Sequence, residues 1–253
     1  MGNDKSSMKL TVFKDERALA TTLAARIAVM LTGQPALVLG LPTGRTPIGL
    51  YHELGTLHSD RLVDLSQATT FNLDEFFGIG PDHPGSYRAF MDAHLFSRVN
   101  LQPERIHVLN GAAPDPDGEC ARYEQAIAGA GGVDLQVLGI GTNGHIGFNE
   151  PGLELAARTH RVTLKESTRR SNAALFGGVI GQVPKDALSM GMATILDARR
   201  IVLLATGKSK ARCIDRVVNG AITTKLPASF LQLHPDVELM LDEAAAEKLT
   251  VRG

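Results

Sequence analysis

Apolar and polar positions follow two different patterns along the chain. Short apolar runs bounded by Gly, Pro or Asn are typical of buried strands. Between them lie longer segments with helical spacing, in which Leu19, Leu23, Ile27 and Leu31 step by four. The pattern predicts strands at 10–13, 36–39, 69–72, 133–140, 160–164, 201–205 and 237–241, and helices at 19–31, after Pro47, at 84–97, 115–128 and 209–218.

This alternation of strand and helix predicts an α/β fold. We expect a single doubly wound, mostly parallel sheet of the Rossmann-like type, with helices on both faces. The length of 253 residues fits one large α/β domain, and no repeat or linker marks a boundary. We therefore predict one domain over residues 8–253. Residues 1–7 match a myristoylation pattern, but we interpret this polar start before a second Met as a disordered end.

Charge, hydropathy and cysteine usage indicate which partners and which cellular location to expect. The chain has 26 Lys and Arg against 27 Asp and Glu, so it lacks the basic surface that binds nucleic acid. The most apolar window, residues 18–31, is interrupted by Arg26 and is too short for a bilayer, so no membrane partner is expected. Cys120 and Cys213 form no C-x-x-C motif, which favours two reduced thiols and a cytoplasmic location.

Unusual polar residues follow directly on four of the predicted strands. The four segments are residues 40–47, 72–75, 141–145 and 206–210. The carboxyl ends of parallel strands share one edge of the sheet, and open α/β sheets bind their ligands at that edge. We therefore expect the four segments to converge on one site.

Two of these segments have the composition of phosphate-binding turns. Each combines a glycine and hydroxyl side chains with the start of a predicted helix, whose free N–H groups attract anions. Neither is a Walker A or G-x-G-x-x-G loop, and for either segment alone the alternative is a plain strand-to-helix turn. The residues that we expect to bind phosphate and sugar are Thr43, Gly44, Arg45, Thr46, Lys208 and Lys210.

The other two segments carry acid–base groups. Asp74 and Glu75 directly follow a strand, where an acidic residue is either a helix cap or a catalytic carboxylate. His145 lies two residues after Asn143 and five before Glu150, so an amide can orient it and a carboxylate can tune its pKa. The alternative is a His held within a tight turn. No metal is expected, because this segment has one His and no His-x-x-x-His pair.

Six blocks of sequence extend these observations over nearly the whole chain. They read LGLPTG at 39–44, FNLDE at 71–75, HPGSY at 83–87, GIGTNGHIGFNEPG at 139–152, QVPK at 182–185 and LQLHP at 231–235. In these blocks the chain resembles the glucosamine-6-phosphate deaminase family, also called glucosamine-6-phosphate isomerases. That family shares its fold with 6-phosphogluconolactonases, which typically have DGHTASLF where this chain has NGHIGFNE at 143–150. The deaminase form fits better.

The resemblance implies aldose–ketose isomerisation with deamination, which converts glucosamine 6-phosphate to fructose 6-phosphate and ammonia without a cofactor. It implies that Asp74 moves a proton between C2 and C1, and that His145 opens the pyranose ring, oriented by Asn143 and Glu150. The expected partner is a small amino sugar phosphate, and a homo-oligomer stays open. The alternatives are an enzyme for galactosamine 6-phosphate or 6-phosphogluconolactone, and a non-catalytic sugar-phosphate sensor.

One position departs from the family pattern in a way that concerns phosphate. Ala174 stands where the family commonly has an Arg that helps to bind phosphate. Arg45 stands where relatives usually have Gly or Ser, so we expect its guanidinium to replace the missing one. Lys210 matches the lysine of the family, and Lys208 is additional.

Overall fold

The computed structural model describes residues 8–249, so the expected disordered end at residues 1–7 lies outside the described part. The strands are β1 (Lys9–Phe13), β2 (Val38–Leu41), β3 (Thr69–Asn72), β4 (Asp74–Phe77), β5 (Ile106–His107), β6 (Leu135–Gly139), β7 (His160–Thr163), β8 (Asp186–Ser189), β9 (Arg200–Ala205) and β10 (Val237–Asp242). The α-helices are α1 (Glu16–Gly33), α2 (Ile48–Ser59), α3 (Tyr87–His94), α4 (Pro116–Gly129), α5 (Glu166–Asn172), α6 (Met192–Leu196), α7 (Ala211–Asn219) and α8 (Glu243–Ala246).

Side chains at the helix starts explain where several helices begin. Asp15 accepts a hydrogen bond from the backbone N–H of Ala18 at 2.8 Å and so caps α1. Asp115 caps α4 in the same way through the N–H of Gly118, with a proline at the first helical position. Ser86 caps α3, which therefore begins after the predicted boundary at 84.

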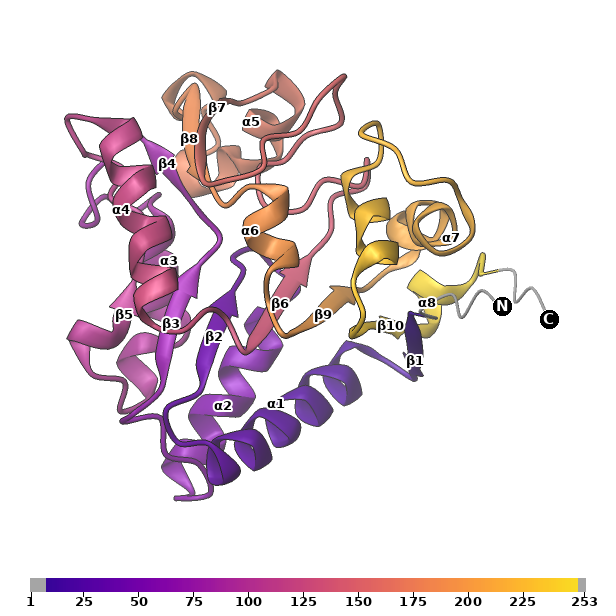
Figure 1. Ribbon diagram of the computed structural model, residues 1–253. Coiled ribbons are helices and arrows are strands. Elements are labelled where there is room, and N and C mark those ends of the chain that lie inside the picture. The colour runs from indigo at the N-terminus through magenta and orange to yellow at the C-terminus, as the bar shows by residue number, and fades with distance from the viewer. Residues whose placement is uncertain (1–7, 250–253) are drawn as a thin grey trace.

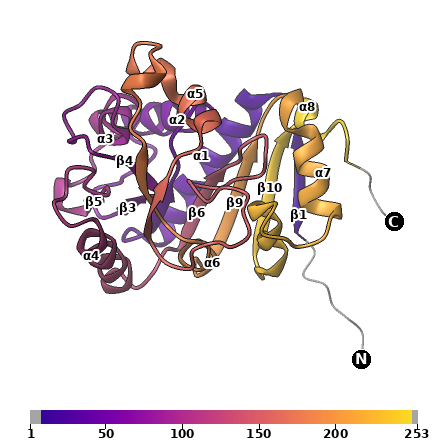
Figure 2. The same ribbon diagram turned by 90° about the horizontal axis from the view of Figure 1, so that it is seen from above.

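Seven strands form the main sheet in the order β1-β10-β9-β6-β2-β3-β5, and all neighbouring pairs are parallel. Helices α1, α2 and α3 pack on one face, while α4, α6, α7 and α8 pack on the other (Figures 1 and 2). Each face has its own cluster of buried Leu, Ile and Val side chains. The predicted doubly wound, mostly parallel sheet with helices on both faces is confirmed.

The strand order changes direction between β2 and β6, at the middle of the main sheet. From β2 the chain adds β3 and β5 on one side, and from β6 it adds β9 and β10 on the other. Such a switch point leaves a crevice at the carboxyl ends of the strands, because the connecting loops diverge there. The four polar segments of the sequence follow β9, β6, β2 and β3, which are consecutive strands of the sheet.

A second sheet of three antiparallel strands, in the order β4-β8-β7, lies beyond the carboxyl ends of the main sheet (Figure 1). The prediction of a single sheet was therefore incomplete. Local sequence predicts a loop at 74–75, no element at 186–189 and a strand of the main sheet at 160–164. The reason for the first omission is physical: β4 reads DEFF, and Asp and Glu are depleted in strands, so tertiary pairing outweighs local preference.

Candidate active site

The structure brings the four polar segments together at the switch point. An added Cβ atom at Gly147 would lie 3.6 Å from Oδ2 of Asp74, so the segment after β6 passes closely over the start of β4. Lys210, after β9, donates to the carbonyl of Ile140 at the end of β6 at 2.6 Å. Arg45, after β2, lies close enough to Lys210 to lower its pKa, although burial of Lys210 has the larger effect. The four loops therefore border one site.

Asp74 is buried at the first position of β4, with 6% of its surface exposed. Among the described residues no group donates a hydrogen bond to its carboxylate. Burial, together with the neighbouring charge of Glu75, raises the pKa of Asp74 to about 8. A carboxyl group with such a pKa takes up and releases a proton near neutral pH, which is the property required of a general base.

Glu75 points to the other face of β4 and has a structural environment. Its carboxylate accepts hydrogen bonds from the backbone N–H groups of Phe76, Tyr87 and Arg88 at 2.8, 2.8 and 2.9 Å. Two of these donors lie in the first turn of α3, where a negative charge is favourable. Burial raises the pKa of Glu75 to about 7, and the three hydrogen bonds oppose that shift. Of the two carboxylates, Glu75 anchors a helix and Asp74 is available for chemistry.

His145 is held by a network of polar side chains. Its Nδ1 lies 2.7 Å from Oδ1 of Asn143, which also accepts the backbone N–H of His145 at 3.1 Å. Nδ2 of Asn143 donates to Oε2 of Glu150 at 2.9 Å, and the other oxygen of Glu150 lies 3.7 Å from Nδ1 of His145. The spacing of these three residues in the sequence thus brings them into contact.

The protonation of His145 follows from its surroundings. Burial lowers the pKa of the imidazole, Glu150 opposes this effect, and the charges of Lys210 and Lys165 lower the pKa further. The imidazole is therefore neutral at neutral pH. About a third of the side chain stays accessible, with 29% exposed, so a substrate can reach the ring.

The loop after β2 offers an exposed cation and backbone groups to an anion. Gly44 has φ +98°, a conformation that a side chain disfavours, and this turn leads into α2 at Ile48. Arg45 is exposed and forms no ion pair with any carboxylate in the part of the chain that the structure describes. Thr43 lies within hydrogen-bonding reach of the hydroxyl group of Tyr87. With Lys210 these groups form a positively charged margin of the site.

Lys208 differs from Lys210 in its orientation. Its ammonium group lies 3.2 Å from the carboxylate of Glu247, just after α8, and 74% of its side chain is exposed. The two other arginines near the missing family Arg are also engaged elsewhere. Arg169 donates to the carbonyls of Ile180 and Val183, and Arg170 pairs with Glu166 at 2.5 Å.

Helix α5 and the residue before it add contacts to this network that no sequence motif indicates. The hydroxyl group of Thr168 donates to Oε1 of Glu150. Lys165, just before α5, donates to the carbonyl of Pro151 at 2.6 Å and is close enough to affect the pKa of His145. No local pattern marks these residues, because more than a dozen positions separate them from the residues that they contact.

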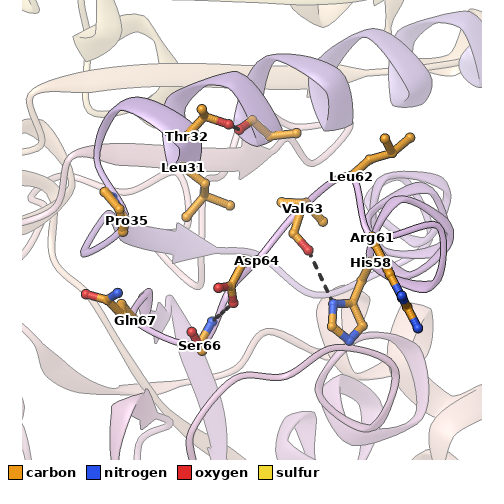
Figure 3. A pocket seen from close by; sticks show the side chains of 11 residues that line it. Leu31, Thr32, Pro35, His58, Arg61, Leu62, Val63, Asp64, Ser66 and Gln67 are labelled. Carbon is orange, nitrogen blue, oxygen red and sulfur yellow. Dashed lines mark hydrogen bonds between the residues drawn. The ribbon is translucent and has the colours of Figure 1, made fainter.

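The other features bear less on chemistry. A cavity of about 450 Å³ lies at the opposite edge of the sheet, lined by Pro35 before β2 and Gln67 before β3 (Figure 3). None of the predicted site residues lines it.

Both Cys120 and Cys213 are buried free thiols. In residues 8–249 no three His, Cys, Asp or Glu side chains are grouped as metal ligands. No helix within the same residues has the length and apolar character to cross a membrane.

Comparison with known proteins places this fold and site in a family. Residues 14–240 match the family model of glucosamine-6-phosphate isomerases/6-phosphogluconolactonase. The chain belongs to this family, which confirms the resemblance carried by the six sequence blocks.

Individual relatives are similar over almost their full length. The glucosamine-6-phosphate deaminase of Halothermothrix orenii is 46% identical over 242 residues, which cover 96% of this chain and 100% of the relative. Glucosamine-6-phosphate deaminase 2 of Bacillus subtilis is 46% identical, with 96% and 98% covered. A solved structure of a monomeric glucosamine-6-phosphate deaminase superposes with a TM-score of 0.91 at 44% identity, covering 95% of this chain and 100% of that one.

The second branch of the family is more distant. The structure of a 6-phosphogluconolactonase from Trypanosoma cruzi superposes with a TM-score of 0.77 at 20% identity, covering 97% of this chain and 98% of that one. At this identity the likeness concerns the fold alone.

Proposed function

We propose that this protein is an enzyme that converts glucosamine 6-phosphate and water to fructose 6-phosphate and ammonia. The observation that carries the proposal is that a buried Asp74, which accepts no hydrogen bond from the described residues, lies at the same edge of the sheet as the network of His145, Asn143 and Glu150. Relatives that are 44–49% identical and bear the name glucosamine-6-phosphate deaminase support the same reaction.

Ring opening is the part of the reaction that we assign to His145. Oδ1 of Asn143 accepts the Nδ1 proton of the neutral imidazole, so Nε2 is free to accept a proton. Nε2 takes the proton of the anomeric hydroxyl group while the bond between C1 and the ring oxygen breaks. The same proton then passes to the ring oxygen, which becomes the C5 hydroxyl group. Asn143 and Glu150 orient the ring for both transfers.

Proton transfer between carbon atoms is the part that we assign to Asp74. The open-chain aldehyde at C1 acidifies the C2 proton, and the carboxylate of Asp74 removes it. A proton from the substrate ammonium group moves to O1, which gives a neutral enolamine. Asp74 then returns its proton to C1, leaving an iminium group at C2. Water adds at C2, and the C–N bond breaks to release ammonium. No step requires a cofactor.

Phosphate binding is assigned to the positive margin of the site. Arg45 and Lys210 each supply a positive charge to the phosphate dianion. Thr43, Gly44 and Thr46, in the same loop as Arg45, offer hydroxyl and N–H donors. Lys208 should contribute least among the proposed contacts, because its ammonium group is already paired with Glu247 and is exposed.

The four loops that carry the proposed site residues meet within one copy of the chain. The two buried free thiols favour a reducing compartment, and we propose a cytoplasmic location.

The test is an assay of ammonia and fructose 6-phosphate formed from glucosamine 6-phosphate, with galactosamine 6-phosphate and 6-phosphogluconolactone assayed in parallel. We expect both products from glucosamine 6-phosphate in equal amounts. Faster turnover of either other compound would reassign the substrate. Binding of the sugar phosphates without any turnover would favour a sensor.

A further inference from the structure

Thr168 lies on α5, outside the four loops that border the site, and yet contacts the acid–base network directly. Its side chain is buried, with 5% of the residue exposed, and its hydroxyl group donates to Oε1 of Glu150. The carbonyl of Thr168 accepts hydrogen bonds from Ser171 and Asn172, both at 2.9 Å, so the backbone at this position is well fixed.

The hydrogen bonds from Thr168 inward have a defined direction. A carboxylate only accepts, so Oε1 of Glu150 receives the Thr168 proton and Oε2 must face a donor. The side-chain atom of Asn143 beside Oε2 is therefore Nδ2, at 2.9 Å, which leaves Oδ1 as the acceptor at the other end of the amide. The backbone N–H of His145 donates to the same Oδ1 at 3.1 Å, which agrees with this orientation.

The orientation of the Asn143 amide determines the tautomer of His145. Because Oδ1 can only accept, the imidazole atom 2.7 Å away must carry a proton, and that atom is Nδ1. A neutral imidazole has one ring proton, so Nε2 is then unprotonated. If the carboxylate of Glu150 moved out of reach of Nδ2 of Asn143, the amide would lose one of the two hydrogen bonds that fix its orientation, and a flipped amide would move the proton on His145 to Nε2.

We propose that Thr168 is a positioning residue that fixes the carboxylate of Glu150 and, through Asn143, holds His145 in the tautomer with the proton on Nδ1. The consequence for turnover rests on the proposed function, since it concerns the ring-opening step. The assignment of the tautomer itself rests only on the hydrogen-bond geometry.

No nearby cation in residues 8–249 takes the place of the Thr168 hydroxyl group as a hydrogen-bond donor to Glu150. Lys165 donates to the carbonyl of Pro151 at 2.6 Å, Lys210 donates to the carbonyl of Ile140 at 2.6 Å, and neither donates to Glu150. Among the described residues, only Asn143 and Thr168 donate hydrogen bonds to the Glu150 carboxylate. Replacement of Thr168 by Val keeps the shape of the side chain and removes one of these two donors.

The experiment compares Thr168→Val, Thr168→Ser and a matched control in the full-length protein. The control is Thr163→Val, which removes a similar bond from a threonine hydroxyl group to the carboxylate of Asp186, at 2.8 Å on the second sheet. Each variant is measured for kcat and KM with glucosamine 6-phosphate. Long-range ¹H–¹⁵N spectra of the imidazoles report the tautomer, with His145→Gln used to assign the His145 signals.

We expect kcat of Thr168→Val to fall roughly 10- to 150-fold, the range for a lost hydrogen bond to a charged group, with little change in KM. The His145 signals should change from the Nδ1–H pattern to a mixture of both tautomers. Thr168→Ser should recover most of the loss, and Thr163→Val should behave as the wild type in both measurements.

Two results would overturn the proposal. One is a Thr168→Val protein with the wild-type kcat and an unchanged Nδ1–H pattern. The other is a Thr168→Ser protein as impaired as Thr168→Val, which would assign the effect to the lost methyl group. If the wild type released no ammonia, the proposed function would fail, but the spectra would still decide whether Thr168 controls the tautomer.

Discussion

The two proposed acid–base groups of the site, Asp74 and His145, occupy contrasting surroundings. Asp74 is buried, accepts no hydrogen bond from the described residues, and has its pKa raised to about 8 by burial and by the charge of Glu75. His145 is partly exposed and belongs to a network through Asn143 and Glu150. Burial therefore sets how strongly the first group holds its proton, whereas hydrogen bonds set where the proton sits on the second.

The neighbouring Glu75 shows that burial alone does not explain the surroundings of Asp74. Glu75 lies on the same strand as Asp74 and is equally buried, but three backbone N–H groups occupy its carboxylate. Those bonds link β4 to the start of α3 and occupy both oxygens of the Glu75 carboxylate. The difference between the two carboxylates is the supply of donors, which depends on the face of the strand that each one occupies.

The strongest test of the contrast removes the proton acceptor at Asp74. We expect Asp74→Asn to fold normally and to lose roughly 10²–10⁴-fold in kcat, because an amide cannot accept the C2 proton. The control is Asp64→Asn, since Asp64 lies at the remote cavity and should leave turnover unchanged. The measurement is ammonia release, with circular dichroism to verify the fold. Near-normal turnover of folded Asp74→Asn would remove the base assignment.

A second test separates the chemistry of the two regions. His145→Gln should lose much more activity on cyclic glucosamine 6-phosphate than on an open-chain analogue that lacks the C5 hydroxyl group. The reason is that only the cyclic form requires the two proton transfers at Nε2, each step of this kind contributing ~10²–10⁴-fold. Asp74→Asn should be equally impaired on both compounds. An equal loss of His145→Gln on both would contradict the ring-opening role.

The sequence predicted the positions of these groups better than their surroundings. Apolar runs identified six of the seven strands of the main sheet, and the polar residues after β2, β3, β6 and β9 indicated where a site would form. The spacing of Asn143, His145 and Glu150 already suggested a held imidazole. These inferences are possible because short apolar runs and the polar residues that follow them can be recognised in the local sequence.

The second sheet and the contact of Thr168 with Glu150 could not be inferred in the same way. Both depend on segments that meet only after folding, such as β4 with β8, and the local sequence DEFF even opposes a strand. The different surroundings of Asp74 and Glu75 were equally hidden, because they depend on the position of the first turn of α3. Likewise, the partner of Lys208 lies on a distant part of the chain.

A third test concerns the cations at the margin of the site. Arg45→Ala should raise KM for glucosamine 6-phosphate at least tenfold, because a charge-assisted hydrogen bond to phosphate contributes ~1.5–3 kcal/mol. Kinetics with Lys208→Ala supply the comparison, and a smaller increase in KM is expected because Lys208 is paired with Glu247. Ala174→Arg should partly restore the affinity of Arg45→Ala. An unchanged KM in Arg45→Ala would place the phosphate anchor elsewhere.

The smallest expected effect concerns stability, and it tests the burial of Asp74 without any substrate. The pKa of this carboxyl group rises from 3.8 in the unfolded chain to about 8 in the folded protein, so between these values the folded state binds more protons. Its contribution to the free energy of unfolding is therefore fully present below pH 3.8 and is lost as the pH rises toward 8. Asp74→Asn lacks this titration, while the raised pKa of Glu75 acts on both proteins in the same direction.

We expect the Tm of Asp74→Asn minus that of the wild type to increase between pH 5 and pH 8 by at least about 2–4 °C, the change that 1 kcal/mol produces in a chain of this size. Calorimetry at a series of pH values measures this difference. A constant difference would mean that Asp74 titrates near its ordinary pKa, and the contrast with His145 would then rest on hydrogen bonding alone.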